Sequence, residues 1–252
     1  IDALTNLKDA RLYIFQGSDD YDEDERISKK TQQYFAHYTP QSSIKTNFNI
    51  PAGHAWVVSN RNYGGKCGGE SMLQDCNFDL AGEVLSWLGV SQAKVKAKAS
   101  SKHIYTVDQR KYVPAGHTAR GISLSAKGYV YVPAVCRATP SACAIHIFYH
   151  GCEQSVSYVG MEVVEGSGLN EHAEASGIII LYPQADDNRL LDSTACFDWS
   201  GRWGAGSHFD EKSGLQLATV ANMLHDIGNI AQTSARHLST PNATVTAAIT
   251  AP

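Results

Sequence analysis

An acid and a histidine follow two strand-like runs in the first quarter of the chain. Asp20 ends the segment GSDD at 17–20, directly after the run at 11–16, and His54 follows the run at 45–50. Open α/β sheets keep their functional groups at the carboxyl ends of the strands. In a hydrolase, such an acid orients an imidazole, which takes the proton from an attacking serine hydroxyl. We therefore predict that Asp20 and His54 form a catalytic acid–base pair.

Two other interpretations of this region compete with that one. A chain with 10 His and 25 acidic residues produces acid–histidine pairs by chance, and the histidine is then a solvated loop residue. Alternate acids at Asp20, Asp22 and Asp24 also fit the start of a calcium loop, which needs glycine at its sixth position and glutamate at its twelfth. Those positions hold Glu25 and Thr31, so we predict no metal site and no cofactor.

A second reactive element is predicted in the segment IFYHGCEQS at 147–155. Hydrolases use a strand that ends in His-Gly before a helix to offer a backbone N–H to the developing oxyanion, and one such donor contributes about 3 to 4 kcal/mol. We expect the amide of Cys152 to be this donor. A disulfide to Cys196 would place Trp199 beside the reacting centre as a rigid apolar wall. Ordinary core packing is the alternative for that tryptophan.

The cysteines form an even set, and none has the C-x-x-C spacing of a structural zinc site. They are Cys67, Cys76, Cys136, Cys143, Cys152 and Cys196. Several pairings are open, but short loops close at low entropic cost, which favours Cys67 with Cys76 and Cys136 with Cys143. Cys152 and Cys196 then remain for each other. Disulfides persist in oxidising compartments, so we predict a secreted, extracellular protein, with six free thiols in the cytosol as the alternative.

The elements around these residues alternate between strand and helix. Strand-like runs are expected at 11–16, 45–50, 103–112, 122–132, 144–149 and 178–183. Helical patterns are expected at 24–38, 80–88, 163–175 and 220–230. The run IIILYP at 178–183 is apolar throughout, as in a strand buried on both faces. Such alternation predicts an α/β fold with a mostly parallel sheet.

We expect a single hydrolase domain in two halves. Residues 1–90 carry the acid and the histidine, and residues 103–235 carry the oxyanion turn. A polar connector at 91–102 joins them, and a Thr/Ala-rich tail at 236–252 is expected to be flexible and unpacked. The net charge of −4 gives no basic surface, which excludes nucleic acid as a partner. No apolar run approaches the roughly 18 residues needed to cross a membrane.

Motifs along the chain resemble one family when they are taken together. In order they are GSDD, AGH, YVP, HGCEQS, IIILYPQA and CFDW. They are similar to those of fungal-type poly(3-hydroxybutyrate) depolymerases, a circularly permuted branch of the α/β-hydrolases, from about Ile1 to about Asn229. The resemblance implies a secreted esterase that degrades polyhydroxybutyrate or a similar polyhydroxyalkanoate. It also implies the roles given above for Asp20, His54, Cys152 and Trp199, together with the three disulfides.

The nucleophile of that family has no counterpart here. The chain contains no G-x-S-x-G, and Ser18, Ser155, Ser167 and Ser207 lack the strand–elbow–helix context that a nucleophilic serine needs. In the family this segment precedes the acid loop. We therefore expect the sequence to be incomplete at its N-terminus, and inactive as it stands, since loss of a catalytic serine lowers turnover about a millionfold.

Two further functions compete with polyester hydrolysis. A non-catalytic polymer-binding protein would use Trp199, Trp203 and Tyr182 to stack on a polymer. A feruloyl or acetylxylan esterase would use the same machinery on another ester, because one hydrolase fold serves many substrates.

Overall fold

The computed structural model describes residues 4–60, 62–91, 97–186, 194–202, 206–235 and 245–247. Its strands are β1 (Leu12–Phe15), β2 (Ile44–Asn47), β3 (Trp56–Val58), β4 (Gly65–Lys66), β5 (Leu73–Asp75), β6 (Ile104–Asp108), β7 (Lys127–Tyr131), β8 (Ala144–Ile147), β9 (Ile178–Tyr182) and β10 (Val245–Ala247). Its α-helices are α1 (Glu25–Phe35), α2 (Leu80–Trp87), α3 (Ala134–Ala138), α4 (Val156–Val159), α5 (Glu162–Gly166), α6 (Leu169–Ser176) and α7 (Leu215–Ala235).

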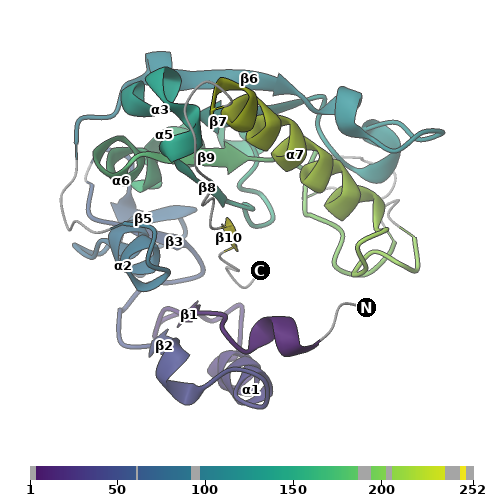
Figure 1. The fold of residues 1–252 in the computed structure, drawn as a ribbon. Coiled ribbons are helices and arrows are strands. Elements are labelled where there is room, and N and C mark those ends of the chain that lie inside the picture. Colours follow the sequence, from purple (N-terminus) through teal and green to yellow (C-terminus); the bar gives the residue numbers. More distant parts are fainter. Residues whose placement is uncertain are drawn as a thin grey trace.

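The strands form a main sheet and two small ones. The main sheet has the order β10-β8-β9-β7-β6. Strands β10, β8 and β9 pair in parallel, β7 pairs antiparallel with β9, and β6 pairs antiparallel with β7. The pair β1-β2 and the trio β3-β5-β4 are parallel throughout. In Figure 1 the β1-β2 pair and α1 lie apart from the main sheet. The predicted α/β fold with a mostly parallel sheet is confirmed.

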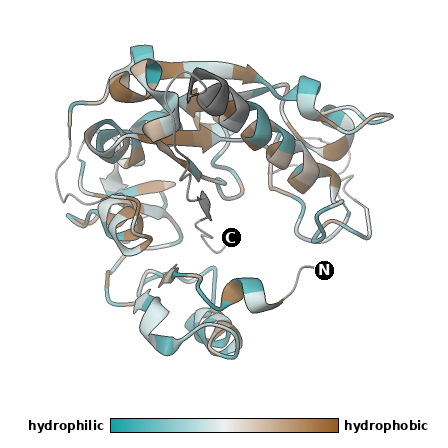
Figure 2. Ribbon diagram, in the orientation of Figure 1, coloured by the Kyte–Doolittle hydropathy of each residue, from teal (hydrophilic) through white to brown (hydrophobic). Residues whose placement is uncertain are grey.

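Helices cover both faces of the main sheet, which explains the uninterrupted apolar run of β9. All five residues of β9 are buried. Ile179 belongs to the same apolar cluster as Met223 of α7, while Ile180 belongs to the cluster that contains Leu169 of α6. Figure 2 shows hydrophobic residues, in brown, along strands of this sheet. Successive residues of β9 thus face two different helical layers.

One apolar core joins the two halves of the chain. Trp56 of β3 donates its indole N–H to the carbonyl of Ser167 at 2.8 Å and meets the ring of Phe148 edge to face at 5.0 Å. Leu80 and Val84 of α2 belong to the same cluster. The first half therefore packs directly on the strands and helices of the second.

Several predicted boundaries need correction. The helix expected at 163–175 is two helices, because Gly168 adopts φ +82° between α5 and α6 and so ends the first. The strand expected at 122–132 begins only at β7, after a 3₁₀ turn that ends with Ser123 at φ +54°. The strand expected at 103–112 is β6 followed by a 3₁₀ turn.

The expected connector and tail are only partly described. Residues 92–96 of the connector lie outside the described part of the chain, as does most of the tail. Within the tail, β10 pairs in parallel with β8, so the expectation that it is unpacked is wrong for those residues. The edge of β8 offers N–H and C=O groups that a further strand satisfies.

The disulfides are those that the spacing favoured: Cys67–Cys76, Cys136–Cys143 and Cys152–Cys196. The third closes a separation of 44 residues and is the one that ties distant segments together. Among the helices described, none is both long enough and apolar enough to span a bilayer.

A buried histidine makes the stability of the fold depend on pH. His146 of β8 is 1% exposed, and neither ring nitrogen has a hydrogen-bond partner among the described residues. Burial lowers the pKa of His146 from 6.5 to about 4. Between these pH values His146 is protonated in the unfolded chain and neutral in the folded protein. The stability that His146 contributes is therefore fully present above its pKa in the unfolded chain, and it is lost as the pH falls toward its pKa in the folded protein.

We predict that the contribution of His146 to this loss reaches up to about 3 kcal/mol, and that His146→Leu removes that contribution and makes the pH dependence shallower. The measurement is the free energy of urea unfolding as a function of pH from neutral to mildly acidic. The exposed His117→Leu is the control and should keep the wild-type slope. An unchanged slope in His146→Leu would contradict the assignment.

Candidate active site

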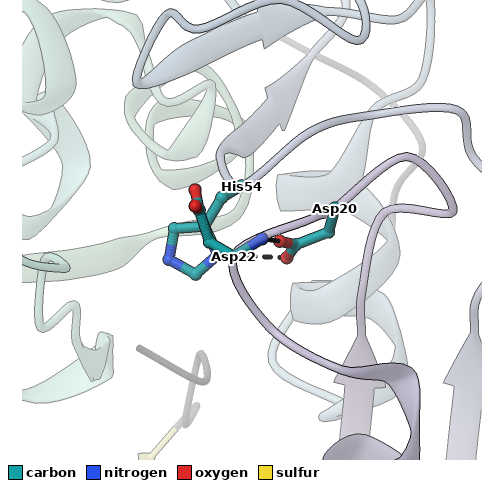
Figure 3. Close-up of side chains that lie close together, drawn as sticks. All are labelled: Asp20, Asp22 and His54. Atoms are coloured by element: carbon teal, nitrogen blue, oxygen red, sulfur yellow. Dashed lines mark hydrogen bonds and ion pairs between the residues drawn. The ribbon is translucent and has the colours of Figure 1, made fainter.

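Asp20 and His54 form a hydrogen-bonded pair. Oδ2 of Asp20 lies 3.0 Å from Nδ1 of His54. Oδ1 of the same carboxylate accepts the amides of Asp22 and Glu23 at 3.0 and 3.1 Å. Because an ionised carboxylate only accepts, Nδ1 carries the proton and Nε2 is left as the basic nitrogen. Figure 3 shows this pair with the exposed Asp22 beside it.

The burial of the two side chains differs in the way that the chemistry needs. The Asp20 side chain is 7% exposed and the His54 side chain 36%. No partner for Nε2 of His54 is found in the described part of the chain. The acid is thus fixed by three hydrogen bonds, while the imidazole retains an accessible basic nitrogen.

Parallel pairing of β1 and β2 brings the two loops together. The loops continue the pairing beyond the strands, since Ser18 N donates to Ile50 O at 2.7 Å and Asp19 N to Ala52 O at 3.1 Å. A Cβ at Gly17 would lie 2.0 Å from Ala52 O, so the approach requires glycine. The GSDD motif therefore owes its glycine to the contact between the acid loop and the histidine loop.

Gln74 of β5 holds the histidine loop from the other side, and the sequence analysis missed it. Its Oε1 accepts the amides of Gly53 and Gly68, both at 2.9 Å, and its Nε2 donates to Gly69 O at 2.6 Å. The side chain is buried. The sequence around it, LQD, carries no signal that would have identified this role, because the burial of the side chain appears only in the folded structure. Gln74 joins the residue before His54 to the loop that is closed by Cys67–Cys76.

The turn after β8 presents the amide of Cys152. Gly151 N donates to Oε1 of Gln154 at 2.9 Å, and Glu153 N donates to Thr194 O at 2.7 Å. No acceptor for Cys152 N is found among the described residues, although its neighbours on both sides are paired. The disulfide to Cys196 ties the turn to the loop that follows β9.

These groups line one pocket of about 190 Å³. Asp20, His54 and Cys152 all contribute to its lining, together with Phe15 of β1 and Phe148 beyond β8. The structure thus brings the predicted acid, base and amide donor together.

Trp199 and the described serines do not occupy the positions expected of a pocket wall and a nucleophile elbow. Trp199 lies on the loop after Cys196, is 64% exposed and is not among the residues that line the pocket. Of the described serines, Ser28 lines the pocket, but it lies within α1 rather than at a strand–helix elbow. The structure therefore leaves the predicted tryptophan wall untested and offers no elbow serine among the described residues.

A mostly parallel sheet with an acid–imidazole pair and an unpaired amide beyond its strands defines an α/β-hydrolase-like protein. No family model matches the chain. It is 30% identical over 234 residues to a poly(3-hydroxybutyrate) depolymerase of Delftia acidovorans, covering 91% of this chain and 44% of that protein. It is 25% identical over 250 residues to a polyhydroxybutyrate depolymerase of Talaromyces funiculosus, covering 90% of this chain and 68% of that one.

Two solved structures share the fold with a TM-score of 0.80. One is a PHB depolymerase with a serine-to-alanine substitution in complex with an R3HB trimer, at 24% identity, and the other is the PHB depolymerase from Penicillium funiculosum, at 23%. Each match covers 92% of this chain and 74% of the other. The chain is a homologue of the PHB depolymerases, which are ester hydrolases, and it has their α/β-hydrolase-like fold. It spans about two-fifths of the bacterial relative and two-thirds of the fungal one.

We predict that Gln74→Leu lowers the free energy of unfolding by about 1 to 3 kcal/mol, because it leaves the buried amide of Gly53 without an acceptor and removes the bond from the Gly68 amide. It should also broaden the His54 imidazole signal in NMR spectra, since the preceding residue loses its anchor. Gln109→Leu is the matched control, because Gln109 is equally buried and hydrogen-bonds the carbonyls of Ser125 and Gln184 instead. Equal broadening in both variants would refute a specific role of Gln74 at the site.

Proposed function

We propose that this chain is the acid-, base- and oxyanion-bearing part of a secreted serine hydrolase that degrades poly(3-hydroxybutyrate) or a similar polyhydroxyalkanoate. The observation that carries the proposal is the convergence of Asp20, His54 and the unpaired Cys152 amide on one pocket. The names of the relatives supply the substrate class.

Each group has a defined role in the proposed reaction. Nε2 of His54 takes the proton from a serine hydroxyl as its oxygen attacks the ester carbonyl, and Asp20 stabilises the resulting imidazolium. The Cys152 amide donates to the oxyanion of the tetrahedral intermediate. The imidazolium then protonates the departing alkoxide, which leaves an acyl-enzyme. Water, deprotonated by the same imidazole, releases the hydroxy acid and regenerates the serine.

The proposal places the nucleophilic serine on a segment outside residues 1–252. Two features of the structure support a strand at this point. Among the described residues, β1 has β2 as its strand partner and no other, and the pocket lies between β1 and the end of β8. A parallel strand there would end beside His54, with its elbow facing the Cys152 amide. A serine segment joined ahead of the acid loop is the circularly permuted order that the motifs suggested.

The proposal includes a contact between Trp199 and the polymer, and an extracellular location for the protein. We assign Trp199, which is 64% exposed and lies outside the lining of the pocket, to contact with the polymer as a wall of the monomer-binding crevice. The three disulfides support an oxidising, extracellular compartment.

We predict that a form of the protein extended upstream of Ile1 hydrolyses (R)-3-hydroxybutyrate trimer and polymer granules, while residues 1–252 alone do not. In the extended form, Asp20→Asn should lower kcat about 10⁴-fold and His54→Ala at least as much. Release of 3-hydroxybutyrate is the quantity to measure. Asp24→Asn is the control, because it removes a nearby charge and keeps an N-cap for α1.

The same assay separates the competing functions. Faster turnover of feruloyl or acetylxylan esters than of the trimer would replace the polyester assignment. Granule binding without hydrolysis by the extended form, whatever residue stands at position 54, would indicate a binding protein.

A further inference from the structure

His150, the first residue of the turn that carries the Cys152 amide, is held on both sides of its ring. Nδ1 lies 2.7 Å from Gly151 O, and Nε2 lies 3.1 Å from Ala185 N in the segment after β9. Its ring packs against that of Phe197 with centroids 4.9 Å apart. His150 therefore contacts each of the three segments that meet at the turn, and it is 5% exposed.

These contacts admit one protonation state. A carbonyl oxygen only accepts, so Nδ1 must donate to Gly151 O. A backbone amide only donates, so Nε2 must accept from Ala185 N. Both bonds are made only by the neutral imidazole. A proton on Nε2 would set two N–H groups against each other inside the protein.

The charged side chains on the surrounding segments are carboxylates, but both ring nitrogens of His150 are already engaged by backbone groups. Among the described residues, the ionisable side chains on these segments are Tyr149, Glu153, Asp186 and Asp198, and Asp198 accepts the amides of Ser200 and Gly201. Burial lowers the pKa of His150 to about 4, and only the Gly151 carbonyl opposes it. The neutral state is thus secure at neutral pH and is lost in mild acid.

We propose that His150 is a positioning residue whose neutral imidazole holds the oxyanion turn against the segment after β9, and that its protonation releases the turn. This rests on the proposed function only in naming the Cys152 amide as a donor. The bond from Ala185 N is a direct reporter, because it ends on the nitrogen that gains the proton.

The test follows the Ala185 and Cys152 amides of the 252-residue chain by ¹H–¹⁵N NMR as the pH is lowered from 7 to about 3.5. In the wild type, both signals should shift together with a midpoint near pH 4, where His150 takes up its proton. His150→Gln cannot be protonated but retains an acceptor, so both signals should stay flat over this range.

The matched control is His146→Gln, which removes another buried histidine with a similarly lowered pKa. Since no hydrogen bond joins the His146 ring to the turn among the described residues, both amide signals should titrate as in the wild type. Signals of the α6 amides verify that each variant remains folded.

Three outcomes would overturn the proposal: an Ala185 signal without a titration, a titration that persists in His150→Gln, or one that is abolished in His146→Gln. None of these readouts involves ester hydrolysis. Failure of the extended protein to cleave polyester would therefore refute the proposed function and leave this inference standing or falling by itself.

Discussion

The hydrogen bond between Asp20 and His54 is the interaction on which the site depends, and it exists only because two loops run side by side. The loops continue the parallel pairing of β1 and β2, and the absence of a Cβ at Gly17 lets them touch. Two backbone amides turn the carboxylate toward the imidazole. The carboxylate is thus oriented toward the imidazole by its own loop.

Buried glutamines hold together the irregular segments beyond the strands. Gln74 bonds the histidine loop, Gln109 bonds the backbone of Gln184, and Gln184 in turn accepts the amide that begins α4. Gln216 of α7 accepts the amide of Asp198 in the loop that carries Trp199. Loops of this kind cannot satisfy their backbone groups in a sheet, and a primary amide supplies both a donor and an acceptor at one point. These side chains replace regular pairing where the site is built.

The oxyanion turn depends on a second set of constraints. The Cys152–Cys196 disulfide restrains the turn covalently, and the Gln154 side chain accepts a hydrogen bond from the Gly151 amide. His150 accepts a hydrogen bond from the segment after β9. Among the described residues, no acceptor is found for the Cys152 amide of this turn. The buried His150 ring lies directly after β8, so the geometry of the turn depends on the protonation state of this imidazole.

The sequence by itself determined the alternation of strands and helices, favoured the observed disulfide pairing, and pointed to Asp20, His54 and Cys152 as candidates, which line one pocket in the structure. Local signals suffice for these, because they consist of hydrophobic periodicity, short cysteine spacings and polar residues placed directly after strands. The tertiary structure alone decided which strands pair, that the main sheet ends in two antiparallel strands, that β10 adds to the edge of β8, and that Gln74 and His150 support the site. Those features depend on contacts between residues far apart in the chain, and no local pattern encodes the partner of a buried amide or imidazole.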